Sequence, residues 1–350
     1  MIHDAAVGRA FGFESRRRLL NEYFSFFGQN GGVTPENAYS HIYRLLLWTD
    51  PTTGLAHCYE SDKAQPGRPW YARSLRFHAW VAEKLGVAPA ELGIQIDWLF
   101  RKAAKDLARG MTVRRLSQAE EQRAPYEGLG MPEPGEDPEL EEMIRDALRP
   151  WLREEPPPEI LARLTQRIHE YTRIENKRKN LVGEGFEDVL AGVIGRLQAP
   201  AIESVMTRAL LHDLPGFSKP PERSKAKKVD LALLAKPDSH RTLITAKWSI
   251  RADREEQFQS DFQAYGNLER ANRPFDYVLV TNEFDPARLA AACERQHQAH
   301  YLFAAVVHVS PEALLATYGS DLDRSFRRAE EHIEAGRLMS LAAWLKKVSG

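Results

Sequence analysis

The stretch TLITAKWSIRADREEQFQSDFQAY, residues 242–265, determines the architecture that we expect for this chain. It opens with a short apolar run rich in β-branched residues, and from Arg251 onward its pattern is typical of a helix. Because side chains on a strand alternate between its two faces, Thr245, Lys247 and Ser249 would share one face. Burying an unpaired ammonium group is costly, so the stretch predicts an anionic partner for Lys247.

A second apolar run, KKVDLALL at residues 227–234, contains the acid best placed to be that partner. Asp230 lies near its start, and an aspartate on one strand beside a lysine on the next forms the core of a metal-dependent site for phosphodiester cleavage. Aspartate offers hard oxygen ligands to Mg²⁺, and lysine orients the attacking water or helps to deprotonate it.

The helix predicted after this strand carries a polar row. From Arg254 to Asp261 is seven residues, which at about 100° per residue returns to within roughly 20° of the start, so both lie in one row with Gln257. The adjoining apolar stripe consists of Phe258, Phe262 and Tyr265. In a simpler interpretation Asp253 is an N-cap, Glu256 completes a capping box, and the polar row faces solvent.

These residues resemble the restriction endonucleases of the PD-(D/E)XK superfamily, in particular the CCGG branch. That branch carries the pattern S-x-K-x-[ST]-x-R-x-D-R and has an acid on the following helix, fourteen residues after the lysine, where this chain has an aspartate. The matching residues are Thr245, Lys247, Ser249, Arg251, Asp253, Arg254 and Asp261. The chain departs from the family at three positions: Thr245 replaces Ser, Asp261 replaces Glu, and Asp230 follows Val229 instead of proline.

The resemblance implies a type II site-specific deoxyribonuclease of a restriction-modification system, with an α/β catalytic domain of PD-(D/E)XK fold. It implies Mg²⁺ as cofactor and catalytic roles for Asp230, Lys247, Asp261 and Glu187. The implied metal ligands are Asp230, Asp261, Glu187 and the carbonyl of Ala246. Glu187 matches better than Glu184, although both glutamates are also explained by a preference for the positive N-terminus of a helix.

The resemblance also implies sequence readout of CCGG by Arg251, Asp253 and Arg254, with Ser249 among the DNA-binding residues. Arginine pairs bidentately with guanine and aspartate accepts from cytosine N4, so the chemistry suits a GC-rich site. A palindrome requires two copies of the reader, so we expect a homodimer, or a higher oligomer such as a tetramer, on double-stranded DNA. A cognate DNA methyltransferase is the expected partner system.

Three parts are expected along the chain. Residues 1–125 are predicted to form a mainly helical N-terminal domain with a role in DNA contact or oligomerisation, residues 126–158 an acidic Pro/Gly-rich linker with a short helix, and residues 159–350 the nuclease domain. The usual first strand of that fold is not evident between residues 197 and 228. Helices are predicted at residues 15–27, 34–47, 73–85, 89–107, 138–152, 159–180 and 180–197, and after Asp285 and Ser310; further strands are predicted at 275–283 and 301–309.

Two basic stretches each allow two interpretations. Residues 57–78 mix arginines with aromatic residues, as in a DNA-facing surface, or as in a loop packed by its aromatics with arginines in solvent. The stretch SKPPERSKAKK, residues 218–228, either contacts phosphates or is a solvated loop.

Composition sets outer limits. The 350 residues have a formal net charge of −1, so any basic surface for nucleic acid must be local. Two cysteines, Cys58 and Cys293, without partners at metal-ligand spacing, indicate a reducing compartment and argue against zinc. The chain has no long apolar run and no signal-peptide core, so we expect the cytoplasm, which the resemblance makes that of a bacterial or archaeal cell.

Two other functions fit the sequence. One is a sequence-specific DNA-binding protein that keeps a nuclease fold without cleaving, and the intact set of Asp230, Lys247 and Asp261 argues against it. The other is a PD-(D/E)XK nuclease of repair or methylation-dependent specificity, for which a separate reader domain is expected and none is evident.

Overall fold

The computed structural model describes residues 9–27, 32–58, 65–107, 138–149, 157–221, 225–251, 255–319 and 323–350. Contacts divide the chain into two compact units, of which one comprises Met1–Ser15 with Arg101–Leu181 and the other Arg16–Phe100 with Val182–Gly350. The second, larger unit contains all the predicted catalytic residues.

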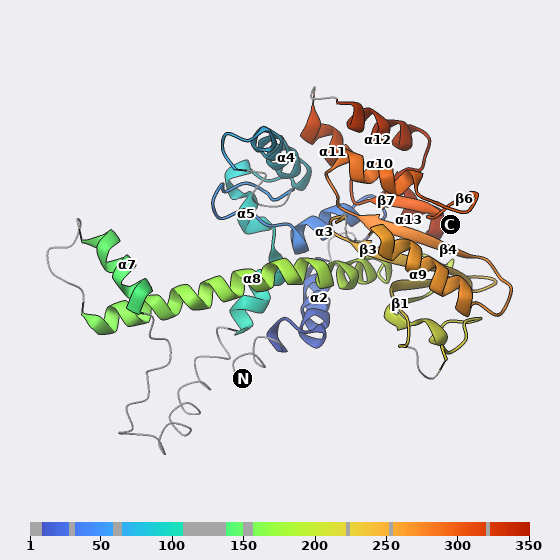
Figure 1. Ribbon diagram of the computed structural model, residues 1–350, viewed down its shortest axis with the longest axis horizontal. Coiled ribbons are helices and arrows are strands. Elements are labelled where there is room, and N and C mark those ends of the chain that lie inside the picture. Colours follow the sequence, from blue (N-terminus) through green and yellow to red (C-terminus); the bar gives the residue numbers. More distant parts are fainter. Residues whose placement is uncertain are drawn as a thin grey trace, which may run out of the picture. The chain divides into compact units, whose positions relative to one another are not determined.

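A mixed six-stranded sheet forms the centre of the larger unit (Figure 1). Its strands, in spatial order, are β1 (Ile202–Leu210), β2 (Lys228–Ala235), β3 (His240–Lys247), β4 (Phe275–Thr281), β7 (Ala305–His308) and β8 (Leu338–Ser340). The first three pair antiparallel, and β3, β4, β7 and β8 pair parallel. The chain is therefore an α/β protein.

The central strands are nearly continuous apolar runs, as expected for strands that are covered on both faces. Val278, Leu279 and Val280 in β4 are all buried. Parallel pairing of β3 with β4 requires a crossover, and α9 (Glu255–Leu268) provides it.

Helix α9 covers one face of the sheet (Figure 1) through its aromatic stripe. The ring of Phe262 stacks on Tyr277 at 5.7 Å, Tyr265 meets Tyr277 edge-on at 5.8 Å, and Phe258 meets Phe303 at 5.5 Å. The apolar stripe predicted for this helix is confirmed.

Strand β1 was not expected from the sequence, and that part of the prediction is wrong. Its residues are half-buried throughout except for the exposed Glu203, so the stretch lacks the apolar alternation of a strand with one buried face. Among the described residues it lies at the edge of the sheet, where β2 is its one neighbour. Within it Arg208 has a φ of 47°, a left-handed conformation that costs a non-glycine residue about 1–3 kcal/mol.

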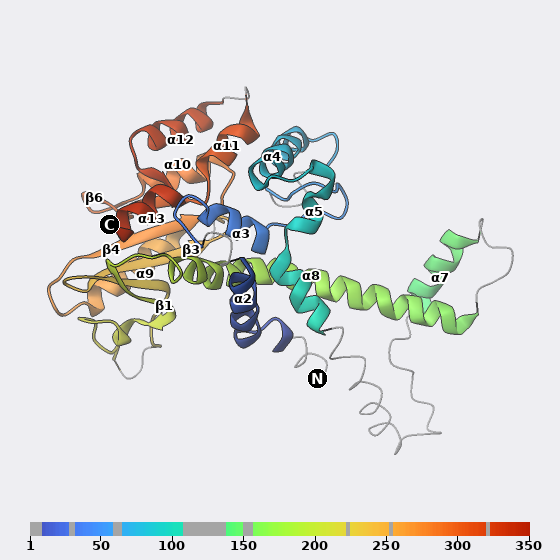
Figure 2. The same cartoon turned by 180° about the vertical axis from the view of Figure 1, so that it is seen from behind.

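The other helices described in the larger unit either precede the first strand in the chain or alternate with the later strands. They are α2 (Phe13–Phe27, which begins in the smaller unit), α3 (Ala38–Leu46), α4 (Pro69–Leu85), α5 (Leu92–Gln95), α10 (Pro286–Glu294), α11 (Pro311–Tyr318), α12 (Arg324–Glu334) and α13 (Leu341–Ser349), with short 3₁₀ turns η1 (Pro89–Glu91) and η3 (Leu211–Asp213). The last helix, α13, contacts α3 (Figure 2), and α11 contacts α4. Strands β5 (Gln296–His297) and β6 (His300–Tyr301) pair to form a separate two-stranded ribbon.

Helices α10 and α11 begin after Asp285 and Ser310, as predicted. The carboxylate of Asp285 accepts hydrogen bonds from two amides of the first turn at 3.0 and 3.4 Å, and Pro286 occupies the first turn. Helix α11 follows Ser310 with Pro311 in its first turn. Gly86, with a φ of 66°, follows the last residue of α4, so this helix ends at residue 85 as predicted.

Several predicted helix boundaries are wrong, among them the start of α4, which lies at Pro69 and not at residue 73. The helix expected from Thr34 begins only at Ala38, because the side chains of Thr34 and Asn37 close a turn on each other's backbone amides at 2.8 and 3.3 Å. The single helix expected over residues 89–107 is interrupted at Asp97, where φ is 59°. A left-handed residue cannot continue a right-handed helix.

Two other elements differ from expectation in their continuity. The two helices predicted from residue 159 to 197 are one helix of 37 residues, α8 (Pro158–Ile194). Gly183 and Gly185 lie near the expected break, but a glycine costs only about 1 kcal/mol in a helix that tertiary packing supports. The strand predicted over 301–309 is split into β6, which pairs with β5, and β7, which pairs with β4.

The contacts group the chain differently from the three predicted parts. Residues 16–100 belong to the same unit as the sheet. Arg76 of α4, for example, donates to the carbonyls of Thr317 and Tyr318 at 2.8 and 3.2 Å, and Arg73 lies over the ring of Tyr318 at 4.1 Å. For these two arginines of the basic stretch 57–78, the structure favours packing over exposure to DNA.

The predicted linker, residues 126–158, lies mostly outside the described residues, apart from α7 (Pro138–Leu148) and the start of α8. In the described ranges, no helix is both long enough and apolar enough to cross a membrane.

Cys58 and Cys293 are buried free thiols, and burial raises the pKa of each to about 12. Such thiols are unreactive.

Candidate active site

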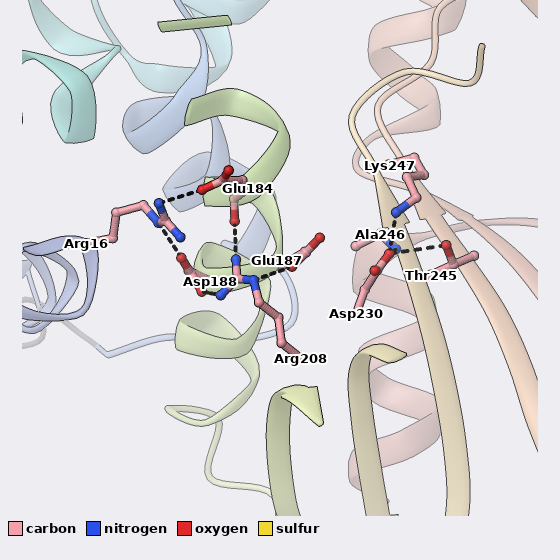
Figure 3. A network of polar contacts seen from close by, with 9 residues as sticks. All are labelled: Arg16, Glu184, Glu187, Asp188, Arg208, Asp230, Thr245, Ala246 and Lys247. Atoms are coloured by element: carbon pink, nitrogen blue, oxygen red, sulfur yellow. Dashed lines mark hydrogen bonds and ion pairs between the residues drawn. The ribbon is translucent and has the colours of Figure 1, made fainter. Parts of the chain in front are cut away.

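The site begins with the pairing of β2 and β3. Leu231 lies opposite Ile244 in an antiparallel register, which places Asp230 opposite Thr245. The Oδ2 atom of Asp230 accepts hydrogen bonds from Lys247 Nζ at 2.6 Å, from the amide of Ala246 at 2.9 Å and from Thr245 Oγ1 at 3.2 Å (Figure 3). The anionic partner predicted for Lys247 is therefore present.

This ion pair is accessible without being fully exposed. The side chain of Lys247 is 14% exposed and that of Asp230 is 24% exposed. All three of the contacts above involve Oδ2 and none involves Oδ1. Both side chains of the pair are therefore partly open to solvent.

Helix α9 covers the sheet face that carries this pair. Tyr277, which α9 contacts, is the register partner of Leu243, and Leu243 shares its face with Thr245 and Lys247. Asp261 on α9 forms an ion pair with Lys227 at 3.4 Å. The crossover helix thus brings its acid to the same side of the sheet as Asp230, as the sequence predicts.

The charges of both aspartates affect the pKa of the buried Tyr265. Burial first, and then the charges of Asp261 and Asp230, raise the pKa of Tyr265 well above its ordinary value. Its hydroxyl donates to the carbonyl of Lys228 at 3.3 Å. Tyr265 therefore lies within electrostatic reach of the two carboxylates.

Glu187 approaches the pair from α8. Its side chain is 14% exposed, and its Oε2 contacts Arg208 Nε at 2.9 Å. Burial and then the charge of Asp230 raise the pKa of Glu187 to about 7, while Arg208 and Lys247 act in the opposite direction. Figure 3 shows Glu187 on the side of α8 that faces Asp230.

Glu184, the second choice from the sequence, lies in a different environment. Its side chain is 66% exposed and pairs with Arg16 at 2.9 Å. Asp230 and Lys247 both act on the pKa of Glu187, the first choice from the sequence.

Three residues of this region were missed by the sequence analysis: Arg16, Asp188 and Arg208. Asp188 is buried and accepts from Arg16 Nε at 2.6 Å and from Arg208 Nη1 at 2.7 Å. No local signal marks them, because Arg208 lies on the unexpected strand β1 and Arg16 is one of three consecutive arginines.

The predicted carboxylate ligands do not form one compact group. In the part of the chain that the structure describes, no three His, Cys, Asp or Glu side chains are arranged to hold a metal ion. Each of Asp230, Asp261 and Glu187 has one oxygen in contact with a cationic side chain. The donors nevertheless fit Mg²⁺, which is commonly bound by one or two carboxylates together with water and substrate phosphate.

The segment that leaves β3 toward the predicted DNA-reading residues is anchored at its root. The amide of Ile250 donates to Oε2 of the buried Glu283 at 2.6 Å, and the amide of Asn282 donates to the carbonyl of Trp248 at 3.0 Å. Ser249 is half-buried and Arg251 is exposed. Asp253 and Arg254 lie outside the described residues, so their predicted roles stay predictions.

The basic stretch 218–228 lies beside the site at its C-terminal end. Lys227 reaches Asp261, while Lys219, Lys225 and Lys228 are exposed. Residues 222–224 are outside the described part of the chain.

Comparison with known proteins leaves the family open: no family model matches the chain, and no curated protein is significantly similar to it in sequence.

Proposed function

We propose that the chain is a Mg²⁺-dependent endonuclease of the PD-(D/E)XK type that cleaves double-stranded DNA at a palindromic site containing CCGG. The observation that supports this most directly is the ion pair of Asp230 and Lys247 at 2.6 Å, on a sheet face that is covered by the acid-bearing helix α9. A homodimer, with a cognate methyltransferase in the same system, belongs to the proposal.

The chemistry sets a large demand. Enzymes that cleave phosphate esters lower the barrier by on the order of 20 kcal/mol, which a lysine alone cannot supply. Bound Mg²⁺ would supply a hydroxide at neutral pH and positive charge at the scissile phosphate. Asp230 would hold it, with Asp261, Glu187 and the Ala246 carbonyl in support.

The protein's own contribution is orientation. The short contact to Asp230 fixes the ammonium group of Lys247, so that Lys247 can orient the attacking water against the phosphate. The exposed lysines of the stretch 218–228 would contact the DNA backbone without reading sequence.

The test is digestion of plasmid DNA with Mg²⁺, followed by mapping of the cut ends. Ends at CCGG sites that are absent with the Asp230→Ala variant support the proposal. Cut ends at unrelated sites, or only at methylated sites, would support the proposed nuclease activity but contradict the CCGG specificity.

A second function is favoured by one observation, the lack of a three-carboxylate group among the described residues. A protein that binds CCGG without cleaving would need no such group. It would shift a CCGG duplex in a gel and leave the plasmid intact at every Mg²⁺ concentration.

A further inference from the structure

Arg208 occupies an unusual position beside the candidate site. Thr207 pairs with Leu231 and Ala209 with Val229, so Arg208 stands opposite Asp230 on the neighbouring strand. Its φ of 47° is left-handed, which is unfavourable for a residue with a Cβ atom and persists only where the surroundings hold it. The side chain of Arg208 makes a set of contacts with α8 at this point.

The guanidinium group of Arg208 grips one turn of α8 with all three nitrogens (Figure 3). Nε contacts Glu187 Oε2 at 2.9 Å, Nη1 contacts Asp188 Oδ1 at 2.7 Å, and Nη2 donates to the carbonyl of Glu184 at 2.8 Å. A planar fork of donors suits this arrangement, whereas the single ammonium group of a lysine cannot reproduce it.

A second arginine braces the first. Arg16 of α2 and Asp188 both have side chains only 4% exposed, and Arg16 Nε contacts Asp188 Oδ2 at 2.6 Å. One buried carboxylate is thus held between two guanidinium groups, one from α2 and one from β1. Removing a partner from such a buried pair is costly, so the arrangement is rigid.

The contact with Arg208 engages the Oε2 atom of Glu187. A glutamate side chain has three rotatable bonds, and without such a contact its carboxylate would sample several rotamers at a half-open site. Groups that hold a metal ligand in place through a hydrogen bond commonly change metal affinity by about 10–100-fold when they are mutated.

We propose that Arg208 is a positioning residue, which holds the carboxylate of Glu187 toward Asp230 and is itself held by the Arg16–Asp188 pair. The inference rests on the proposed function, in which Glu187 supports the metal that Asp230 binds. It assigns to a residue on β1 a role that is exerted through Glu187.

The test is the affinity for Mn²⁺, measured by calorimetry on the chain bound to a CCGG duplex with a non-hydrolysable scissile linkage. Arg208→Lys should weaken Mn²⁺ binding by about tenfold and raise the Mg²⁺ concentration for half-maximal cleavage of an ordinary duplex in parallel. Arg208→Gly is the second variant, because glycine accepts the φ of 47° and so preserves the backbone if the lysine variant fails to fold.

The matched control is Arg328→Lys, since Arg328 pairs with Glu294 between α12 and α10, away from these residues. It should leave Mn²⁺ affinity unchanged. In a Glu187→Gln background, Arg208→Gly should produce little further loss, because the carboxylate that it positions is gone.

Unchanged Mn²⁺ affinity in both Arg208 variants, with wild-type binding intact, would overturn the positioning role and leave the proposed function standing. A purely structural role would lower the folded fraction and the cleavage rate without moving the half-maximal Mg²⁺ concentration, and that result would also overturn it. Failure of the wild-type complex to bind Mn²⁺ would overturn the proposed function, and the inference with it.

Discussion

Separate and joint removal of the charges at Asp230 and Lys247 tests the central pair of the site. The variants are Asp230→Asn, Lys247→Met and the double variant, each close in size to the native residue. Single substitutions are not sufficient, because Asp230 also accepts from Thr245 and Ala246 and its charge raises the pKa of Glu187. The double-mutant cycle removes those shared effects and isolates the coupling between the two charges.

The expected coupling follows from the exposure of the pair. Fully exposed ion pairs contribute about 0.2–1 kcal/mol, whereas breaking a buried pair costs about 3–5 kcal/mol. At 2.6 Å, and with side chains 14% and 24% exposed, this pair lies between those limits. We expect a coupling free energy of about 1–3 kcal/mol, in line with charge-assisted hydrogen bonds.

The free energy of unfolding is measured by urea titration, with tryptophan fluorescence as the signal and EDTA present to remove divalent ions. Cleavage of a CCGG plasmid and gel-shift binding are measured on the same preparations. Both single variants should lose cleavage while they still bind the specific duplex.

Two results would refute the reasoning. A coupling below about 0.5 kcal/mol, the usual additivity error, would mean that the ion pair does not form in solution. Normal cleavage by either single variant would remove these residues from the active site.

Three further predictions follow from the same geometry. Asp261→Ala should abolish cleavage, and full activity would mean that its spacing from Lys247 has no catalytic meaning. Arg251→Ala should cost about 1–3 kcal/mol in binding discrimination between a CCGG duplex and one with a single changed base. Lys225→Ala should weaken binding to both duplexes alike and reduce the salt dependence of binding. An Arg251 variant that weakens binding to both duplexes equally would show that Arg251 contacts only the DNA backbone. The pKa of Glu187 is raised from 4.5 to about 7, so the folded state binds more protons than the unfolded state between those pH values. The free energy of unfolding of the wild type, measured in EDTA, should therefore fall relative to that of Glu187→Gln by about 1–3 kcal/mol as the pH rises through this window. A difference that does not depend on pH would contradict the raised pKa.

The sequence alone determined those features whose physical cause is local. The Asp230–Lys247 pair could be predicted because strand alternation places Lys247 on a buried face that requires an anion. The aromatic stripe of α9 follows from helical periodicity, and the start of α10 follows from the capping carboxylate of Asp285.

Only the tertiary structure decided which distant segments complete the site. Strand β1 is half-buried at a sheet edge, so no alternation marks it, and its register places Arg208 opposite Asp230. The contact of Arg16 with Asp188 joins residues 172 positions apart, and the two side chains are buried only because α2 and α8 pack together. Contacts of this kind have no signature in local propensity or periodicity, because their stability arises from burial that exists only once the chain has folded.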